Sequence, residues 1–279
     1  MAAAYALQLT NIGLATHPWQ LMLSLFIFGI CGNMSNIAVN TQGVMAEQLY
    51  PRPIMASFHG MWSAAGFTGA LLGLLMSSLK VAPYPHFWFT AIIATGINVL
   101  ANRSLVPGRG EGKTNQESFF SKPNAVLVQL GIIGFCSMAS EGAMFDWSGV
   151  YFKEVIHTRA SLVPLGYACF MVMMAAGRFA GDRLVLRYGR RLMMQICGVS
   201  ISAGLALSVL FPYLIAAVPG FMMVGFGVSI MVPSVYSAAG KVAGIPPGRA
   251  LGFTSGISYL GFLMGPPLIG YVAQLSRRC

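Results

Sequence analysis

Residues 177–191 read GRFAGDRLVLRYGRR and place five arginines within fifteen residues of a chain that is only 9% charged. Apolar runs long enough to cross a bilayer lie on both sides of this stretch. Lys and Arg are enriched in cytoplasmic loops, so a basic cluster between two apolar runs indicates which side of the membrane it faces. The stretch therefore predicts a membrane protein with a cytoplasmic loop at this position.

The composition supports a membrane protein. Hydrophobic residues make up 56% of the 279, and the mean hydropathy is +0.69, whereas about a quarter of the residues of a soluble domain are charged. The net charge is +10, but the basic residues lie in short loops and form no continuous stripe. An anionic membrane face is therefore the expected partner, and nucleic acid is not.

The apolar runs predict an all-α integral membrane fold with about nine transmembrane helices. A spanning helix needs about 20 apolar residues, and turn signals such as Pro51-Arg52-Pro53 and Pro246-Pro247-Gly248 separate the runs. The predicted spans are residues 1–16, 19–40, 54–79, 86–102, 124–145, 160–182, 191–215, 217–240 and 249–274.

The polar segment 103–123 is typical of a flexible linker. It predicts two domains, four helices in residues 1–102 and five in residues 124–279, joined by a cytoplasmic linker. With residue 1 in the cytoplasm, twelve Lys and Arg residues fall in inner positions and five in outer ones. This bias is the one expected of a multi-pass protein with that orientation.

An internal repeat accompanies this pattern, because residues 52–73 match a stretch 197 residues later. The matched pairs are Arg52 with Arg249, Trp62 with Tyr259, Leu71 with Leu268, and Gly73 with Gly270. Duplicated helical bundles are common among transporters. The repeat predicts that the chain holds the third to eleventh of twelve helices and is truncated at both ends; a natural nine-helix protein is the alternative.

Several stretches resemble the major facilitator superfamily, and most closely its fucose-permease-like branch of bacterial inner-membrane proteins. Besides 177–191, they are residues 29–47 (GICGNMSNIAVNTQGVMAE), 141–147 (EGAMFDW), 225–236 (GFGVSIMVPSVY) and 261–271 (GFLMGPPLIGY). The resemblance implies two helical halves that rock about a central cavity in the bacterial inner membrane. It also implies that the arginine-rich loop helps to latch one conformation.

The resemblance implies which residues form the cytoplasmic loop motif, and at one position this loop differs from the family pattern. The set is Gly177, Arg178, Gly181, Asp182, Arg183, Arg187, Gly189, Arg190 and Arg191. In the family an acid of this loop pairs with Arg, but Leu186 stands where that acid is usual. We expect Asp182, one turn earlier, to pair with Arg178 or Arg183 instead.

Three amides share one face of the predicted helix that begins at residue 19. Asn33, Asn36 and Asn40 fall within an arc of about 80°. Such amides suit hydrogen bonds to the hydroxyls of a sugar-like solute in a cavity. The alternative is hydrogen bonding between helices.

Glu141 is the strongest single candidate for a cavity or coupling residue, with Ser137 one turn before it. An acid at membrane depth is costly unless it is paired or faces a water-filled cavity, and there it can take up and release a proton during transport. The alternative is a fixed structural acid paired with Lys153 or Arg159.

His59, Tyr236 and Tyr259 complete the predicted cavity. His59 begins a stripe of small residues, Tyr236 shares a helix face with Pro233, and Tyr259 lies on a polar face of the last predicted helix. For each of them, packing between helices is the alternative.

No GxSxG, HExxH or P-loop motif and no metal-ligand spacing occurs, so we expect no enzyme, metal site or cofactor. The predicted function is secondary active transport by alternating access, acting on a small polar solute such as a sugar, with proton coupling and as a monomer. The alternative is a transporter-derived membrane protein without transport, whether a sensor, a scaffold or an inactive truncated fragment.

Overall fold

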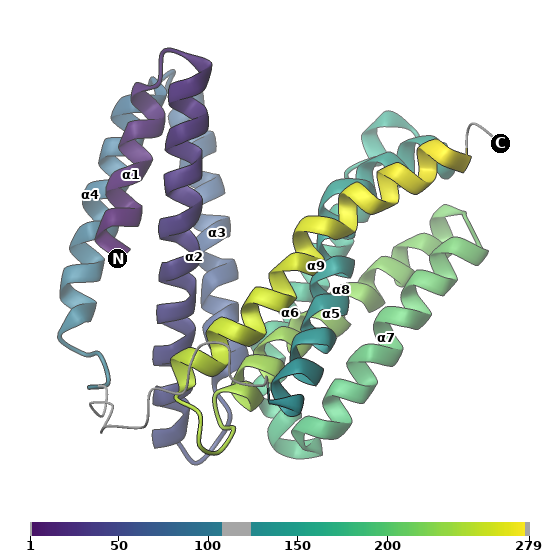
Figure 1. Ribbon diagram of the computed structural model, residues 1–279. Coiled ribbons are helices and arrows are strands. Elements are labelled where there is room, and N and C mark those ends of the chain that lie inside the picture. The colour runs from purple at the N-terminus through teal and green to yellow at the C-terminus, as the bar shows by residue number, and fades with distance from the viewer. Residues whose placement is uncertain (1, 108–123, 277–279) are drawn as a thin grey trace. The chain divides into compact units, whose positions relative to one another are not determined.

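A computed structural model describes residues 2–107 and 124–276, and all regular structure in these residues is helical (Figure 1). The α-helices are α1 (Ala2–Leu14), α2 (Pro18–Leu49), α3 (Met55–Ser78), α4 (Pro83–Asn102), α5 (Ala125–Val150), α6 (Leu165–Tyr188), α7 (Arg190–Leu210), α8 (Leu214–Ala239) and α9 (Pro247–Ser276). A π-helical turn (Tyr151–Val155) and a 3₁₀ turn (Ala160–Leu162) connect α5 to α6. The predicted all-α fold is confirmed.

The helix ends follow local chemistry. Asn124 caps α5, its Oδ1 accepting the Val126 N–H at 2.9 Å. Gly189 separates α6 from α7 with φ +81°, a conformation that glycine adopts without strain. The end of α2 was predicted at residue 40, but the helix continues to Leu49. Residues 41–49 include several polar side chains, yet nothing breaks the backbone before Pro51.

Six helices of the described residues are long and apolar enough to cross a membrane: α2, α5 with its π-helical turn, α6 with the preceding 3₁₀ turn, α7, α8 and α9. With 13 residues, α1 is shorter than the roughly 20 that a full span needs. These helices make the chain an integral, multi-pass membrane protein.

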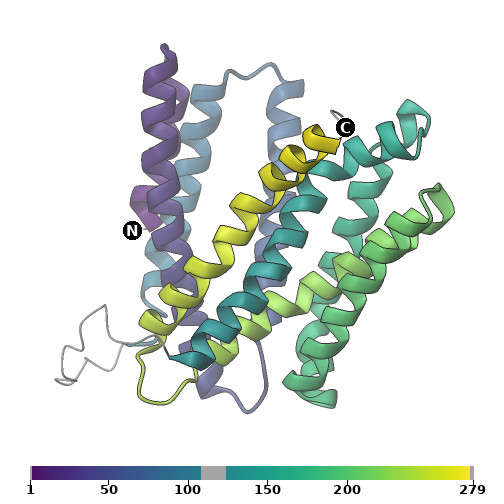
Figure 2. The same cartoon turned by 45° about the vertical axis from the view of Figure 1, so that its right-hand side comes forward.

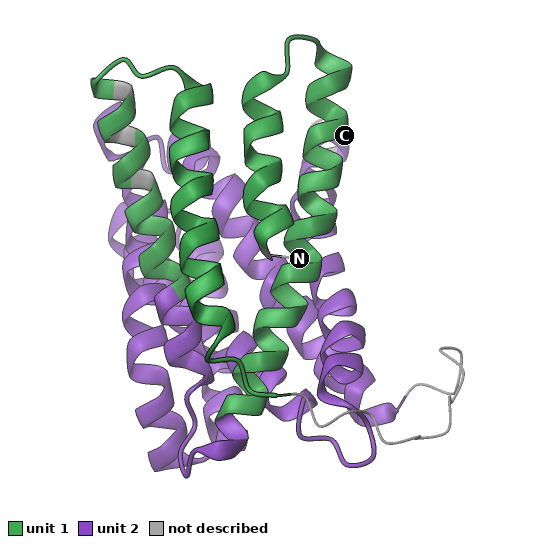
Figure 3. Ribbon diagram, turned by 90° about the vertical axis from the view of Figure 1, so that its left-hand side faces the viewer, with its two compact units in different colours: residues 1–46, 62–117 green, residues 47–61, 118–279 purple. Residues whose placement is uncertain are grey.

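The chain divides into two compact units, coloured separately in Figure 3. The first unit comprises residues 1–46 and 62–117, and the second comprises residues 47–61 and 118–279. Within the first unit, α1 packs against α4. Most of the predicted linker, residues 108–123, lies outside the described residues, so the division into domains at 103–123 stays a prediction.

The second unit is built around α8. This helix packs against α5, α6, α7 and α9, while α5 and α9 run alongside each other (Figures 1 and 2). Most residues of α8 are buried, and aromatic side chains such as Phe152, Phe170 and Phe221 fill the core beside it. Polar residues on α5, α6 and α8 are therefore held away from water by neighbouring helices.

Candidate functional site

A buried ion pair joins α5 to α6 in the second unit. Arg178 Nη2 donates to Glu141 Oε1 at 3.5 Å, and the two side chains are only 4% and 8% exposed. Charge-assisted N–H···O bonds are commonly about 2.7–2.9 Å long, so this pair is buried but loose. Lys153, one of the two expected partners of Glu141, pairs instead with the adjacent Glu154 at 3.1 Å.

Three other predicted cavity residues lie around this pair. Tyr236 on α8 is buried, and its ring centroid is 6.1 Å from that of His59 in the first turns of α3. His59 lies within electrostatic range of Arg178, and Tyr236 within range of both Glu141 and Tyr259. Arg178, a residue of the loop motif, thus lies close to Glu141 and His59, and Tyr236 links these two to Tyr259.

Ser137 on α5 lines a cavity of its own. It is buried and lines a cavity of about 450 Å³ between α5, α7 and α8. The surface of this cavity is mainly apolar and includes Ile133, Met194 and Ile201. Glu141 and Arg178 do not line it. Ser137 therefore lines this cavity, whereas Glu141, one helical turn further along α5, does not.

The three asparagines belong to the first unit and differ in their surroundings. Asn40 Nδ2 donates to Asn36 Oδ1 at 2.5 Å and to the Asn36 carbonyl oxygen at 2.9 Å. Asn40 is buried, Asn36 is half-buried and Asn33 is exposed. Two of the three amides thus bond to each other within α2, while the third is accessible.

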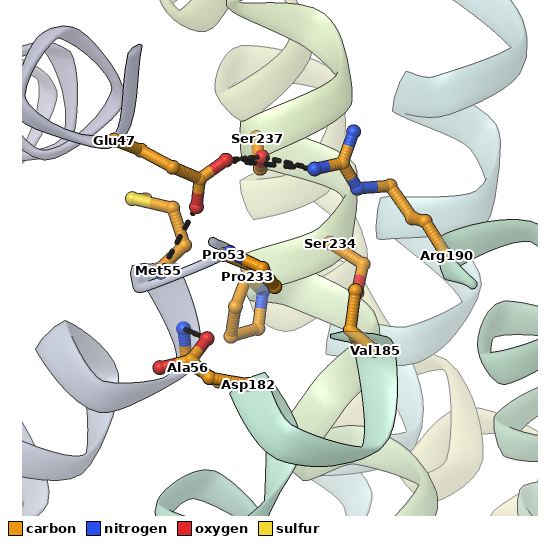
Figure 4. A pocket seen from close by; sticks show the side chains of 10 residues that line it. All are labelled: Glu47, Pro53, Met55, Ala56, Asp182, Val185, Arg190, Pro233, Ser234 and Ser237. Atoms are coloured by element: carbon orange, nitrogen blue, oxygen red, sulfur yellow. Dashed lines mark hydrogen bonds and ion pairs between the residues drawn. The ribbon is translucent and has the colours of Figure 1, made fainter. Parts of the chain in front are cut away.

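Asp182, in the loop motif, caps the start of α3. Its carboxylate accepts the N–H group of Ala56 at 2.9 Å (Figure 4) and the N–H group of Ser57 at 2.7 Å. The first N–H groups of a helix lack intrahelical partners and carry partial positive charge, which a carboxylate satisfies. Gly181 permits this approach, because a Cβ there would lie 2.8 Å from the Ala56 Cβ. The Asp182 carboxylate thus serves as a helix cap, and its expected pairing with Arg178 or Arg183 stays a prediction.

A second buried acid, Glu47 at the end of α2, was missed by the sequence reasoning. Its Oε1 accepts hydrogen bonds from Lys241 Nζ at 2.5 Å, from Arg190 Nη2 at 3.5 Å, and from the Ser237 hydroxyl. Arg190 also donates to Ser237 Oγ at 2.7 Å, as Figure 4 shows. The cluster of Glu47, Arg190, Ser237 and Lys241, which we term the Glu47 cluster, joins α2 to α7, α8 and the turn after α8.

The other oxygen of Glu47 accepts the N–H groups of Ile54 and Met55, both at 3.1 Å. Every side of this carboxylate is therefore hydrogen-bonded, and its side chain is 1% exposed. One signal was present in the sequence: Glu47 is one of only seven acids in the chain. The sequence predicts a span over residues 19–40, which leaves Glu47 outside the predicted helix.

The remaining residues of the loop motif separate into buried and exposed groups. Gly177 packs against Ser229 of α8, and Arg178 and Arg190 point into the structure as described above. The exposed arginines are Arg183, Arg187 and Arg191. The Arg187 guanidinium lies 5.3 Å from the centroid of the Tyr188 ring. These three are placed to contact water or lipid headgroups.

The site contains ionisable side chains and hydroxyls buried between apolar helices. No group of three or more His, Cys, Asp or Glu that could hold a metal occurs within residues 2–107 and 124–276. Buried ionisable groups in membrane helices are costly and mark solute pathways, ion pathways and proton relays. Fold and site together define a polytopic membrane protein of the transporter class.

The chain belongs to the major facilitator superfamily, since the sequence profile described as Major Facilitator Superfamily matches residues 1–266. It is 31% identical to an uncharacterised MFS-type transporter of Yersinia pestis over 274 residues, which cover 98% of this chain and 71% of that protein. It is 32% identical to an uncharacterised transporter of Sinorhizobium fredii, over 98% of this chain and 73% of that protein.

A solved structure shares the fold. The MFS transporter FucP, crystallised in an outward conformation, superposes with a TM-score of 0.80 over 98% of this chain and 74% of FucP, at 15% identity. The predicted family is thus confirmed, and family and fold identify a membrane transporter rather than an enzyme. Transporters of this family bind small-molecule solutes and lie in the lipid bilayer.

Proposed function

We propose that this chain is a secondary active transporter that moves a small polar solute, such as a sugar, by alternating access and with proton coupling. The observation that carries the proposal is the buried Glu141–Arg178 pair between α5 and α6. A stable apolar core gains nothing from such a pair, because burying two charges costs about as much as their attraction returns. A buried pair inside membrane helices is therefore best explained by a role in transport.

Glu141 is the proposed coupling residue. It is the acid of the buried ion pair, and its 3.5 Å contact with Arg178 is long enough for the pair to open without breaking a tight bond. His59, Tyr236 and Tyr259 provide ring and hydroxyl groups around it for a polar solute. Asn33, Asn36 and Asn40 are proposed as solute-binding amides of the first unit, and Ser137 as a solute-binding hydroxyl of the second unit.

Alternating access requires contacts that form in one conformation and release in another. We assign this role to Asp182 and to the Glu47 cluster, which tie the ends of α2, α6, α7 and α8 to the start of α3. These bonds are ionic or charge-assisted and lie at helix ends, where a small movement can break them together. The loop motif is thereby proposed to latch one conformation, in a bacterial inner membrane and in a monomer.

The test is uptake into proteoliposomes that hold the 279-residue chain. A thermal-shift screen of sugars, amino acids and small acids in detergent selects the solute, and an imposed pH gradient then drives its uptake. We expect the gradient to drive accumulation by the wild type and not by Glu141→Gln. Lys153→Gln, which alters an exposed ion pair on the same segment, is the matched control and should behave as wild type.

Accumulation by Glu141→Gln at the wild-type level would contradict the role given to Glu141. Solute binding without any uptake, in either direction of the gradient, would favour a sensor or scaffold. Failure of every solute to bind or move would favour an inactive product.

A further inference from the structure

We propose that Arg178 binds a carboxylate of the transported solute, and that this carboxylate replaces Glu141 as the partner of Arg178 when Glu141 takes up a proton. The solute class is then a small hydroxylated acid with a single negative charge. The inference rests on the proposed transport function and narrows its substrate.

The first argument concerns the net charge of the buried pair. Arg178 remains protonated at all relevant pH values, and Glu141 supplies the balancing negative charge. Once Glu141 is protonated, the site carries one positive charge between helices that bury it almost completely. An uncompensated buried charge is strongly unfavourable. A monoanionic solute restores neutrality, whereas a neutral sugar does not.

The second argument concerns which states can be buried. The empty site with Glu141 ionised is neutral, and so is the loaded site with Glu141 protonated. The two half-filled states, proton without anion or anion without proton, each carry one net charge. Burying a net charge is unfavourable, so only the two neutral states can be closed off from water during transport. One proton and one anion therefore cross the membrane together, and no net charge is moved.

The third argument concerns geometry. Guanidinium and carboxylate form planar, paired hydrogen bonds that are commonly about 2.7–2.9 Å long. The Arg178–Glu141 contact is a single bond of 3.5 Å, so Glu141 does not use this capacity. A solute carboxylate that approaches in the plane of the guanidinium would make the better bond.

Other titratable groups face the pair and do not change its charge balance. They are His59 on α3, Tyr167 on α6 and Tyr236 on α8, and Tyr259 on α9 lies near Tyr236. A proton on His59 would put a second positive charge near Arg178, which like-charge repulsion disfavours. The proton is therefore assigned to Glu141, and the tyrosines are left as neutral hydrogen-bonding groups for the solute hydroxyls.

The experiment compares acids with neutral counterparts of similar shape: gluconate with sorbitol, glucuronate with glucose, and galacturonate with galactose. Thermal shift and equilibrium binding are measured on the purified chain, and uptake on proteoliposomes. We expect at least one acid to bind better than its counterpart. In Arg178→Gln its affinity should fall by about 30-fold or more. Its uptake by the wild type should respond to a pH gradient and not to a membrane potential.

Glu141→Gln gives a more specific test. Its loaded site is neutral, but its empty site keeps the Arg178 charge, so the protein should exchange labelled for unlabelled acid yet lose net uptake. A purely structural role for the pair would reduce both together. Should Arg178→Gln fail to fold, the double variant Arg178→Gln/Glu141→Gln removes both charges, and it should fold and bind no acid.

Two results would overturn the inference while leaving transport intact: neutral counterparts taken up with protons in place of the acids, or unchanged acid affinity in Arg178→Gln or the double variant. If no compound in the panel binds or exchanges, this inference is overturned, and the wider screen of sugars, amino acids and small acids then decides the transport proposal.

Discussion

Glu47 and Glu141 are both buried carboxylates of the second unit, but they are held in different ways. Glu47 accepts hydrogen bonds from Lys241, Arg190, Ser237 and two backbone N–H groups. Among the residues that the structure describes, Glu141 forms one ion pair, with Arg178 at 3.5 Å. The first acid lies at the end of its helix, and the second lies well within its helix between packed neighbours.

The difference indicates what each acid can do. A carboxylate surrounded by five donors is stabilised in its ionised form, because every one of these bonds favours the charge. Such a group fixes the helix ends that it joins. A carboxylate with one long hydrogen bond loses little interaction energy when it is protonated. Its protonation state can therefore change during a transport cycle. The following variants test this contrast, beginning with the largest expected effect.

Glu47→Ala should give the largest loss of stability, about 3 kcal/mol of unfolding free energy. The substitution leaves Arg190 and Lys241 without their acid and two N–H groups without an acceptor. Unfolding in mixed detergent and dodecyl sulfate micelles, followed by circular dichroism, measures the effect. Glu47→Gln is the control of similar shape and should lose less. Equal stability of wild type and Glu47→Ala would remove the structural role of the cluster.

Arg178→Gln should cost less, about 2 kcal/mol, because Glu141 can take up a proton once its partner is gone. Adding Glu141→Gln should recover at least half of that loss, since removing both members of a buried pair is often nearly neutral. The four proteins form a double-mutant cycle, measured by the same unfolding assay. Additive losses would show that the two side chains do not interact.

Asp182→Ala should cost about 1 kcal/mol, the usual effect of removing a helix cap. The loss comes from the unpaired N–H groups of Ala56 and Ser57. Asp182→Asn keeps an acceptor and should lose only a few tenths of this amount. The reverse order, with Asn worse than Ala, would argue against the cap.

Lys153→Gln should have the smallest effect, within about 0.5 kcal/mol, because exposed ion pairs add little stability. The side chains of Lys153 and Glu154 are 71% and 49% exposed. A loss as large as that of Arg178→Gln would mean that exposure does not distinguish the pairs, and the contrast drawn above would fail.

Much of the fold could be predicted from the sequence. Apolar length and proline punctuation located nine helices, since a chain in lipid satisfies its backbone by forming helices and ends them where Pro intervenes. The predicted end of α2 was wrong, because the side chains become polar after residue 40 while the helical backbone continues. Residues 41–49 of α2 look like a loop, but a helix tolerates polar side chains at its end.

The candidate site was predicted residue by residue, but not as a set of contacts. Glu141, His59, Tyr236 and Tyr259 were selected because polar groups at membrane depth are costly. Arg178, the neighbour of Glu141 and His59, was predicted only as part of the loop motif. The spacing of a motif along the chain does not tell in which direction a side chain points. Glu47 gave only the weak signal of an acid in an acid-poor chain.

By itself, the sequence determined the class of protein: apolar runs of spanning length, basic loops and a loop motif follow from the properties of a bilayer and are local along the chain. Only the tertiary structure decided which charges meet. Glu141 and Arg178 are 37 positions apart, and Glu47 and Lys241 are 194 apart. Contacts at such separations depend on how the helices pack and on how each is rotated about its axis. A helix that is hydrophobic all round has no apolar stripe, so its sequence does not determine that rotation.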